Sequence, residues 1–165
     1  MLLPNYRGST GFGRAFRRGD LDGWGAGDYD DVMSGFRYMA KSGLASLDNC
    51  AHVGWSYGGY MTALALTKAK ETHGIALKAV VGGGCLTDLI SQVGTTDISK
   101  IYQSSNSGKY YWNDPRVQAN FLKRSAMYHV VSVANMQSAI RMHPLILPSF
   151  SEERECADAV VPRTA

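Results

Sequence analysis

One serine in this chain has the neighbours that a nucleophile needs. Ser56 is the centre of Gly54-Trp55-Ser56-Tyr57-Gly58, which matches the pattern G-x-S-x-G. In a nucleophile elbow this pattern forms a tight turn from a strand into a helix, where glycines two residues to either side of the serine avoid steric clashes. The turn would expose the Ser56 hydroxyl above a sheet, and the Tyr57 backbone N–H would donate to an oxyanion. The alternative is a glycine-rich turn that only packs.

The elements that must position this serine alternate between strand and helix. The predicted elements, in chain order, are the end of a strand over residues 1–3, a helix over 28–41, a strand over 50–55, a helix over 57–70, a strand over 75–81, a mostly helical or irregular stretch over 87–128 and a strand over 143–147. Gly59 would let the helix after the serine pack close to its strand. This alternation predicts the α/β class, with a mostly parallel sheet flanked by helices on both faces.

Composition excludes several other classes of protein. The chain has 165 residues, a net charge of +3 and 45% hydrophobic residues, which suits one globular domain and not a disordered or strongly nucleic-acid-binding chain. No apolar run approaches the roughly 18 residues that span a bilayer. Three unclustered cysteines, Cys50, Cys85 and Cys156, indicate free thiols in a reducing, cytoplasmic compartment. We expect no metal site and no cofactor, because no ligand cluster, P-loop or dinucleotide fingerprint occurs.

Three segments resemble the prolyl oligopeptidase family of serine peptidases, and within it the dipeptidyl-peptidase and acylaminoacyl-peptidase branch. The segments are Gly54-Trp55-Ser56-Tyr57-Gly58-Gly59-Tyr60-Met61, Asn5-Tyr6-Arg7-Gly8-Ser9-Thr10-Gly11-Phe12-Gly13 with Gly23-Trp24-Gly25 and Asp28-Tyr29-Asp30-Asp31 after it, and Ser125-Ala126-Met127-Tyr128-His129-Val130. The resemblance implies a partial α/β-hydrolase catalytic domain over residues 1–147 and a divergent tail over 148–165. It also implies hydrolysis of short peptides by a Ser-Asp-His triad, with Ser56 as nucleophile and Tyr57 as an oxyanion donor.

The resemblance assigns expected roles to further residues. The segment after Gly84 corresponds to part of the family's specificity pocket, although it lacks the aromatic pattern of a proline-selective one. The residues predicted to line this pocket are Cys85, Leu86, Asp88 and Leu89. Arg7 is expected to pair with a nearby carboxylate such as Asp28 or Asp30 instead of contacting substrate. Trp24 is expected to pack instead of binding a ligand.

The acid and the base of the triad do not follow the family pattern. An ungapped comparison puts Glu152 in the place of the acid, with Ser149 where the family has the glycine of the turn. No histidine lies between residues 144 and 165, where the base belongs. The four histidines come earlier, and we expect His52 to be buried or at a strand edge, His73 to lie in solvent, His129 to be structural and His143 to precede a strand. The family's second oxyanion donor would precede residue 1.

Three interpretations stay open on the sequence alone. The first is a serine peptidase that acts on short peptides, impaired by the missing acid and base and by a truncation or frame change after about residue 147. The second is a non-catalytic α/β-hydrolase fragment that pairs with a second copy or a relative through an open sheet edge, because exposed edges invite strand pairing. The third is a lipase or esterase, which the segments over residues 5–13 and 24–31 disfavour. Only a catalytic chain predicts a reactive Ser56.

Overall fold

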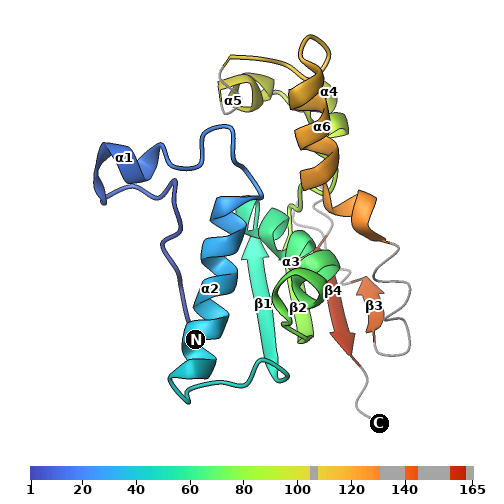
Figure 1. The fold of residues 1–165 in the computed structure, drawn as a ribbon. Coiled ribbons are helices and arrows are strands. Elements are labelled where there is room, and N and C mark those ends of the chain that lie inside the picture. The colour runs from blue at the N-terminus through green and yellow to red at the C-terminus, as the bar shows by residue number, and fades with distance from the viewer. Residues whose placement is uncertain (105–107, 131–139, 145–156, 163–165) are drawn as a thin grey trace, which may run out of the picture.

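The computed structural model describes residues 1–104, 108–130, 140–144 and 157–162, and the last two of these segments are described as backbone strands (Figure 1). The elements in these ranges are α1 (Gly13–Arg17), α2 (Gly27–Lys41), β1 (Cys50–Trp55), α3 (Tyr57–His73), β2 (Leu77–Gly83), α4 (Leu89–Thr95), α5 (Ser99–Ser104), α6 (Pro115–Arg124), the 3-10 helix η1 (Ala126–His129), β3 (Ile140–Pro144) and β4 (Ala157–Pro162). None of the helices described is long and apolar enough to cross a membrane.

The four strands form one sheet in the order β1-β2-β4-β3. β1 and β2 are parallel, with Trp55 opposite Gly83, and α3 is the crossover between them. A parallel pair joined by a helix is the βαβ unit that the sequence predicts. β4 pairs antiparallel with β2, with Val160 opposite Val80, and β3 pairs antiparallel with β4. The α/β class is therefore confirmed, and the antiparallel strands extend the sheet on the far side of β2.

One expectation about strands needs correction. Residues 1–3 form no strand, because no neighbouring strand offers them hydrogen bonds; Leu2 lies instead against Gly35 of α2. Within the divergent tail over residues 148–165, the structure describes one strand, β4. Val160 and Val161 are β-branched residues that favour a strand once a partner is present, and β2 supplies that partner. The strand expected over 143–147 overlaps β3 (Ile140–Pro144) at residues 143 and 144, and residues 145–147 lie outside the described residues.

Helix α3 covers one face of the parallel pair and carries the largest part of the core (Figure 1). The buried residues of α2 and α3 include Tyr29, Val32, Met33, Tyr60, Met61, Leu64 and Ala65. Along β1 the side chains alternate between half-buried and exposed, so the strand shows only one face to α3. The opposite face keeps Val53, Trp55 and Val81 exposed, at 71%, 56% and 39%. Within the described ranges, the helices thus cover one face of the pair and not both.

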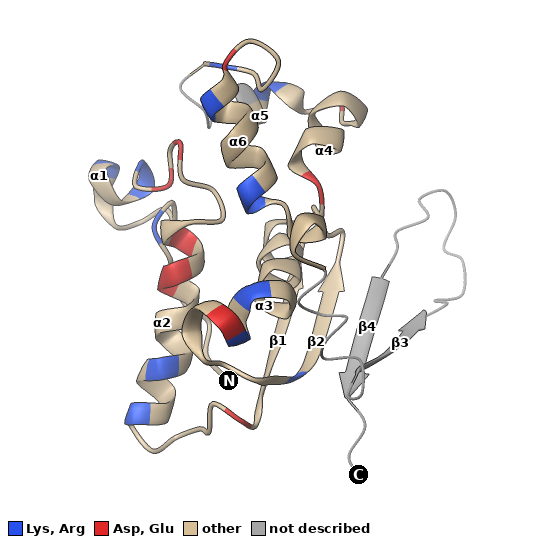
Figure 2. Ribbon diagram, turned by 45° about the vertical axis from the view of Figure 1, so that its right-hand side comes forward, with Lys and Arg blue, Asp and Glu red and all other residues tan. Residues whose placement is uncertain are grey.

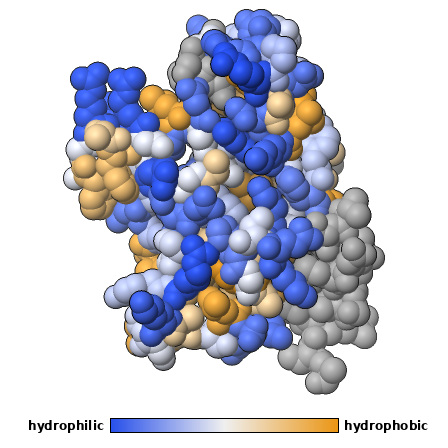
Figure 3. All heavy atoms as spheres, in the orientation of Figure 1, coloured by the Kyte–Doolittle hydropathy of each residue, from blue (hydrophilic) through white to orange (hydrophobic). Residues whose placement is uncertain are grey.

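The charges on α2 are divided between its two ends. The first turn of α2 carries Asp28 and Asp30 and its last turn carries Lys41, so the charges oppose the helix dipole at both ends (Figure 2). The face of the molecule that carries α2 and α3 is mainly hydrophilic, with scattered hydrophobic groups (Figure 3). Helices α4, α5 and α6 lie together above the carboxyl ends of β1 and β2, where chemistry collects in α/β folds (Figure 1).

Candidate active site

Ser56 forms the turn between the carboxyl end of β1 and the first residue of α3. Its backbone has φ 54° and ψ −114°, a conformation that residues other than glycine rarely adopt. Two hydrogen bonds hold this conformation: the Ser56 N–H donates to the Gly83 carbonyl and the Ser56 carbonyl accepts from the Tyr60 N–H, both at 2.9 Å. Such backbone strain costs about 1–3 kcal/mol and persists only where the surroundings enforce it. The residue is exposed, so the predicted elbow geometry is confirmed.

The glycines of the elbow do different work. A Cβ atom at Gly54 would overlap the carbonyl group of Gly58, and one at Gly59 would overlap the carbonyl of Gly83 on β2. A Cβ atom at Gly58, by contrast, would meet nothing within 4 Å. The expectation that glycine is needed on both sides of Ser56 is therefore wrong for Gly58, because the first turn of α3 directs this position into open space. Close approach of helix to strand is what requires Gly54 and Gly59.

Tyr57 begins α3, where the first backbone N–H groups of a helix have no intrahelical partner. This is the group expected to donate to an oxyanion. The side chain of Tyr57 points the other way, into an aromatic cluster: its ring centroid lies 5.1 Å from Trp24, 6.0 Å from Tyr6 and 5.4 Å from Tyr60. Burial, together with the nearby charge of Asp28, raises the pKa of the Tyr57 phenol far above its ordinary value. Trp24 packs here, as the sequence predicts.

Asp28 lies beneath this cluster and is fully buried. Its Oδ2 accepts the hydroxyl of Tyr57 and the N–H of Gly25 at 3.2 Å, and its Oδ1 accepts the N–H groups of Ala26 and Tyr29 at 2.9 and 2.8 Å. Burial raises the pKa of this carboxyl, and the four donors oppose that shift. From the sequence, Asp28 was expected only at the start of the helix over 28–41 and as a candidate partner of Arg7. The three glycines at 23, 25 and 27 before it were the available signal for a turned-in carboxylate.

Arg7 makes the ion pair that the sequence predicts, but with a different partner. Its Nε and Nη2 atoms lie 2.7 Å from Oδ2 and Oδ1 of Asp31, and its backbone N–H donates to Oδ2 at 3.0 Å. Asp28 and Asp30 were expected here, and this is wrong because successive helical residues turn by about 100°. Asp28 faces the core, Asp30 reaches His73 at 3.2 Å, and only Asp31 faces the N-terminal segment.

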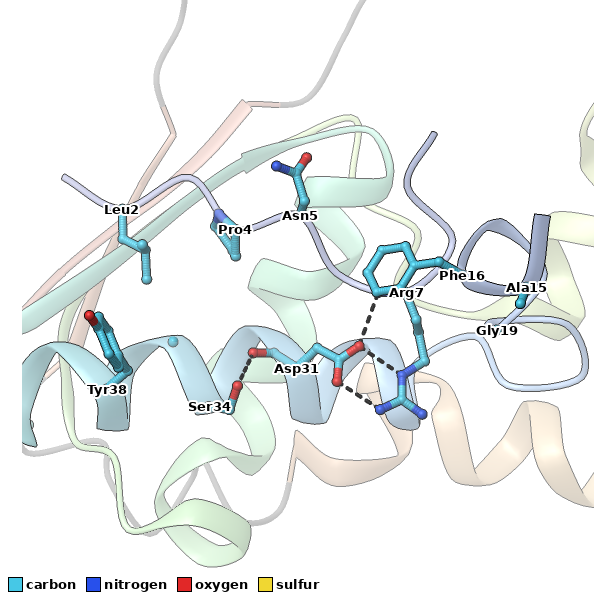
Figure 4. A pocket seen from close by; sticks show the side chains of 11 residues that line it. Leu2, Pro4, Asn5, Arg7, Ala15, Phe16, Gly19, Asp31, Ser34 and Tyr38 are labelled. Atoms are coloured by element: carbon cyan, nitrogen blue, oxygen red, sulfur yellow. Dashed lines mark hydrogen bonds and ion pairs between the residues drawn. The ribbon is translucent and has the colours of Figure 1, made fainter. Parts of the chain in front are cut away.

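Among the residues that the structure describes, two cavities flank these elements. The larger, about 690 Å³, lies between the N-terminal segment and α2, with the Arg7–Asp31 pair on its wall and Leu2 and Tyr38 toward its other end (Figure 4). No residue of the elbow lines it. The smaller, about 210 Å³, adjoins the elbow through the Tyr57 ring. The residues that line it are Tyr6, Gly8, Ser9, Asp20, Trp24 and Tyr57.

The four residues predicted to line a specificity pocket take different positions. Leu89 is 1% exposed and belongs to the hydrophobic core, and Leu86 packs against that core. Asp88 caps α4, where its side chain accepts from the Ile90 N–H at 3.1 Å and from the Ser91 hydroxyl at 2.5 Å. The Cys85 sulfur packs against Gly59 and Gly82, because Cβ atoms at these two positions would lie 3.1 and 2.5 Å from it. None of the four lines either cavity, and their contact with substrate stays a prediction.

The acid and base positions are only partly described. Glu152 and Cys156 lie outside the described residues, and His143 is described only as backbone in β3. The His52 ring nitrogen Nδ1 lies 2.7 Å from the Thr62 hydroxyl, and burial lowers the pKa of His52. His129 bonds the Lys123 carbonyl at 2.8 Å through Nε2. Both side chains are therefore engaged away from Ser56.

His73 was expected in solvent, and this is wrong. It ends α3, and its side chain is 11% exposed because this end of α3 packs against α2. One ring nitrogen lies 2.6 Å from the Arg37 guanidinium, and the other lies 3.2 Å from Asp30. Burial and the positive charge of Arg37 lower the pKa of His73. This ring is bound between two charged groups and does not point to the elbow.

Sequence reasoning missed one structural serine in the third resemblance segment. Ser125 is fully buried, donates its hydroxyl to the Phe121 carbonyl at 2.6 Å and accepts the Leu89 N–H at 2.9 Å. It thus ties the end of α6 to the start of α4, above the elbow. The nearby Met127 N–H donates to the Thr87 carbonyl at 3.1 Å and adds a second tie between the same segments.

Known proteins with similar sequences belong to one family of peptidases. The sequence profile of the prolyl oligopeptidase family matches residues 1–147. The dipeptidyl aminopeptidase BIII of Pseudoxanthomonas mexicana is 34% identical over 93 residues, which are 56% of this chain and 13% of that protein. The acylamino-acid-releasing enzyme 1 of Oryza sativa subsp. japonica is 34% identical over 98 residues, which are 59% of this chain and 12% of that protein. The chain therefore spans only about an eighth of these relatives.

Solved structures agree in fold. A puromycin-hydrolyzing peptidase of Mycobacterium tuberculosis superposes with a TM-score of 0.67 and 28% identity, over 78% of this chain and 18% of that one. The acylaminoacyl peptidase of Pyrococcus horikoshii superposes with a TM-score of 0.65 and 23% identity, over 78% of this chain and 20% of that one, and so shows the fold alone. Because the family profile covers most of the chain and the fold is that of α/β-hydrolase peptidases, the chain belongs to the prolyl oligopeptidase family.

Proposed function

We propose that this chain contributes the nucleophile of a serine peptidase that hydrolyses short peptides. The observation that carries the proposal is the exposed Ser56 hydroxyl on a strained turn, directly before the N-terminus of α3. In the proposed reaction the Ser56 oxygen bonds to the carbonyl carbon, and the carbonyl oxygen becomes an oxyanion facing the Tyr57 N–H. The C–N bond then breaks and the amine leaves with the proton that the Ser56 hydroxyl gave up. Water next attacks the ester, the bond between the Ser56 oxygen and the carbonyl carbon breaks, the carboxylic acid leaves, and a proton from the water restores the Ser56 hydroxyl. The names of the relatives support peptide-like substrates.

The proposal is tested by covalent labelling. The purified chain is incubated with a fluorophosphonate, and the labelled peptide is identified by mass spectrometry, with Ser56→Ala as the control and circular dichroism to show that both are folded. We expect label on Ser56 and none on the variant. Dipeptidyl and acetyl-aminoacyl coumarin amides then separate the two substrate classes of the relatives. A folded chain that takes up no label at Ser56 would overturn the proposal.

A second candidate is a non-catalytic unit that binds a partner through a sheet edge. It is favoured by the histidines, because the side chains of His52, His73 and His129 are each bonded to groups other than Ser56 and a serine without a base is a weak nucleophile. β1 ends the described sheet, so one of its edges is unpaired there, beside the exposed Val53. Such an edge pairs with a strand of a second copy or of a relative.

The second candidate predicts association instead of labelling. Sedimentation velocity at rising concentration should show dimers, and Val53→Lys should reduce them, because a lysine on an edge strand opposes pairing. Lys78→Arg is a matched control, since Lys78 lies on β2, away from that edge, and keeps its charge. A chain that stays monomeric at every concentration would exclude this candidate. A reducing, cytoplasmic location, which the unclustered cysteines of the sequence favour, stays a prediction for either candidate.

A further inference from the structure

We propose that Asp28 is a positioning residue for the elbow: its buried carboxylate holds the Tyr57 phenol and thereby aims the Tyr57 backbone N–H at the oxyanion site. The inference rests on the proposed role of Ser56. It assigns a task to a carboxylate that belongs to another helix and that lies 28 residues before the serine in the chain. Asp28 touches no reacting atom, so it would act through Tyr57 alone.

The first support is that Asp28 is built as a fixed anchor. It is fully buried and its two oxygens accept four hydrogen bonds, three from the backbone of the turn into α2 and one from Tyr57. A buried carboxylate with every acceptor used has one orientation, because any rotation would leave a donor unpaired at a cost of about 1–3 kcal/mol. The anchor therefore transmits the position of α2 to the first residue of α3.

The second support is the place of Tyr57 in the elbow. Tyr57 follows Ser56 directly, and the same Cα atom carries both the anchored side chain and the N–H that would face the oxyanion. The ring is also held by Trp24 and Tyr6, so both ends of the side chain are fixed. The turn at Ser56 is strained and would relax if its following residue could move. The hydrogen bond to Asp28 opposes this relaxation.

A bond that only stabilises the fold would behave differently, and the chain offers a matched control for that case. Tyr60 lies one turn later on α3, is fully buried, and donates its hydroxyl to the Arg124 carbonyl at 2.9 Å. The same hydroxyl also lies 3.4 Å from the Trp24 carbonyl. Replacing either tyrosine by phenylalanine removes the hydroxyl with its hydrogen bonding and keeps the ring. Tyr57 follows Ser56 directly in the chain, whereas Tyr60 meets Ser56 only through its backbone N–H, which Tyr60→Phe keeps. Only Tyr57→Phe should therefore change the reaction when both variants are equally folded.

The experiment measures the rate of fluorophosphonate labelling at Ser56 over a range of probe concentrations, for the wild type, Tyr57→Phe and Tyr60→Phe. Each rate is divided by the folded fraction from circular dichroism. Loss of one oxyanion donor lowers rates by about 100- to 1000-fold; a misaimed donor should cost less, about tenfold, in the limiting rate, with little change in the half-saturating concentration. Tyr60→Phe should stay within about twofold of the wild type.

The outcomes separate the inference from the function beneath it. If the wild type labels and Tyr57→Phe labels at the same limiting rate, the positioning role is overturned and the nucleophile stands. If the folded wild type does not label at Ser56, the proposed function is overturned and the positioning role with it. Asp28→Asn is a second test of the same role, because the asparagine NH₂ group would face a backbone N–H donor and the anchor would be lost. Its limiting rate should fall as in Tyr57→Phe. The backbone amide signal of residue 57 in a ¹⁵N spectrum should shift in Asp28→Asn, which leaves residues 57 and 58 themselves unchanged, and should not shift in Tyr60→Phe.

Discussion

Gly54→Ala and Gly58→Ala should differ in their effect on stability, although both replace a glycine of the same motif. At residue 54 a Cβ atom would lie 2.8 Å from the Cα atom of Gly58 and still closer to its carbonyl, and all of these are backbone atoms of the turn. Overpacking costs about 1–3 kcal/mol when side chains can yield. Here only backbone can yield, so we expect Gly54→Ala to cost about 3 kcal/mol or more. Total stability is about 5–15 kcal/mol.

At residue 58 a Cβ atom would meet nothing within 4 Å, and the residue lies inside α3. Alanine is favoured over glycine in a helix by about 0.5–1 kcal/mol, so Gly58→Ala should be neutral or slightly stabilising. In thermal unfolding followed by circular dichroism, Gly54→Ala should lower Tm by about 6–12 °C, at about 2–4 °C per kcal/mol for a chain of this length. Equal losses in the two variants, or no loss in Gly54→Ala, would refute the argument from steric contact.

Three further predictions concern strain and charge. Ser56→Gly should be more stable than Ser56→Ala by about 1 kcal/mol in urea titrations, because glycine relieves the positive φ; equal stabilities would contradict a strained turn. Hydrogen bonding from Arg7 lowers the pKa of Asp31, so the ion pair stabilises the fold fully above the unfolded pKa of about 3.9. Asp31→Asn should therefore lower the free energy of unfolding by about 0.5–1 kcal/mol at pH 7 and by progressively less below pH 4. A loss of stability that is the same at every pH would argue against the ion pair. Burial lowers the pKa of His52, so the contribution of its neutral ring to stability is complete above the unfolded pKa of about 6.5 and is lost as pH falls below that value. His52→Asn retains a donor for Thr62 and should remove this part of the pH dependence of Tm. A Tm profile that is unchanged in the variant would count against this role of His52.

Local sequence was enough to predict the elbow and the elements that flank it. The predicted strand over residues 50–55 matches β1, and the helices predicted over residues 28–41 and 57–70 match α2 and α3 to within three residues at each end. These features depend on hydrophobic spacing, on charges in a first turn and on glycines in a short motif. All of that information lies within about 20 residues of chain, so no knowledge of distant partners is needed.

Only the tertiary structure decided which partners the side chains of these elements meet. The aspartates at 28, 30 and 31 look alike in sequence, yet one holds Tyr57, one reaches His73 and one binds Arg7. Residues 157–162 became a strand because β2 offered them an edge, and Leu89 became core because the α4–α6 pair closed over it. In each case the outcome depends on contacts between segments far apart in the chain. The rotation of about 100° between successive helical residues is fixed locally, so the sequence shows the direction in which each side chain leaves the helix. Which element lies in that direction is set by the packing of the whole fold.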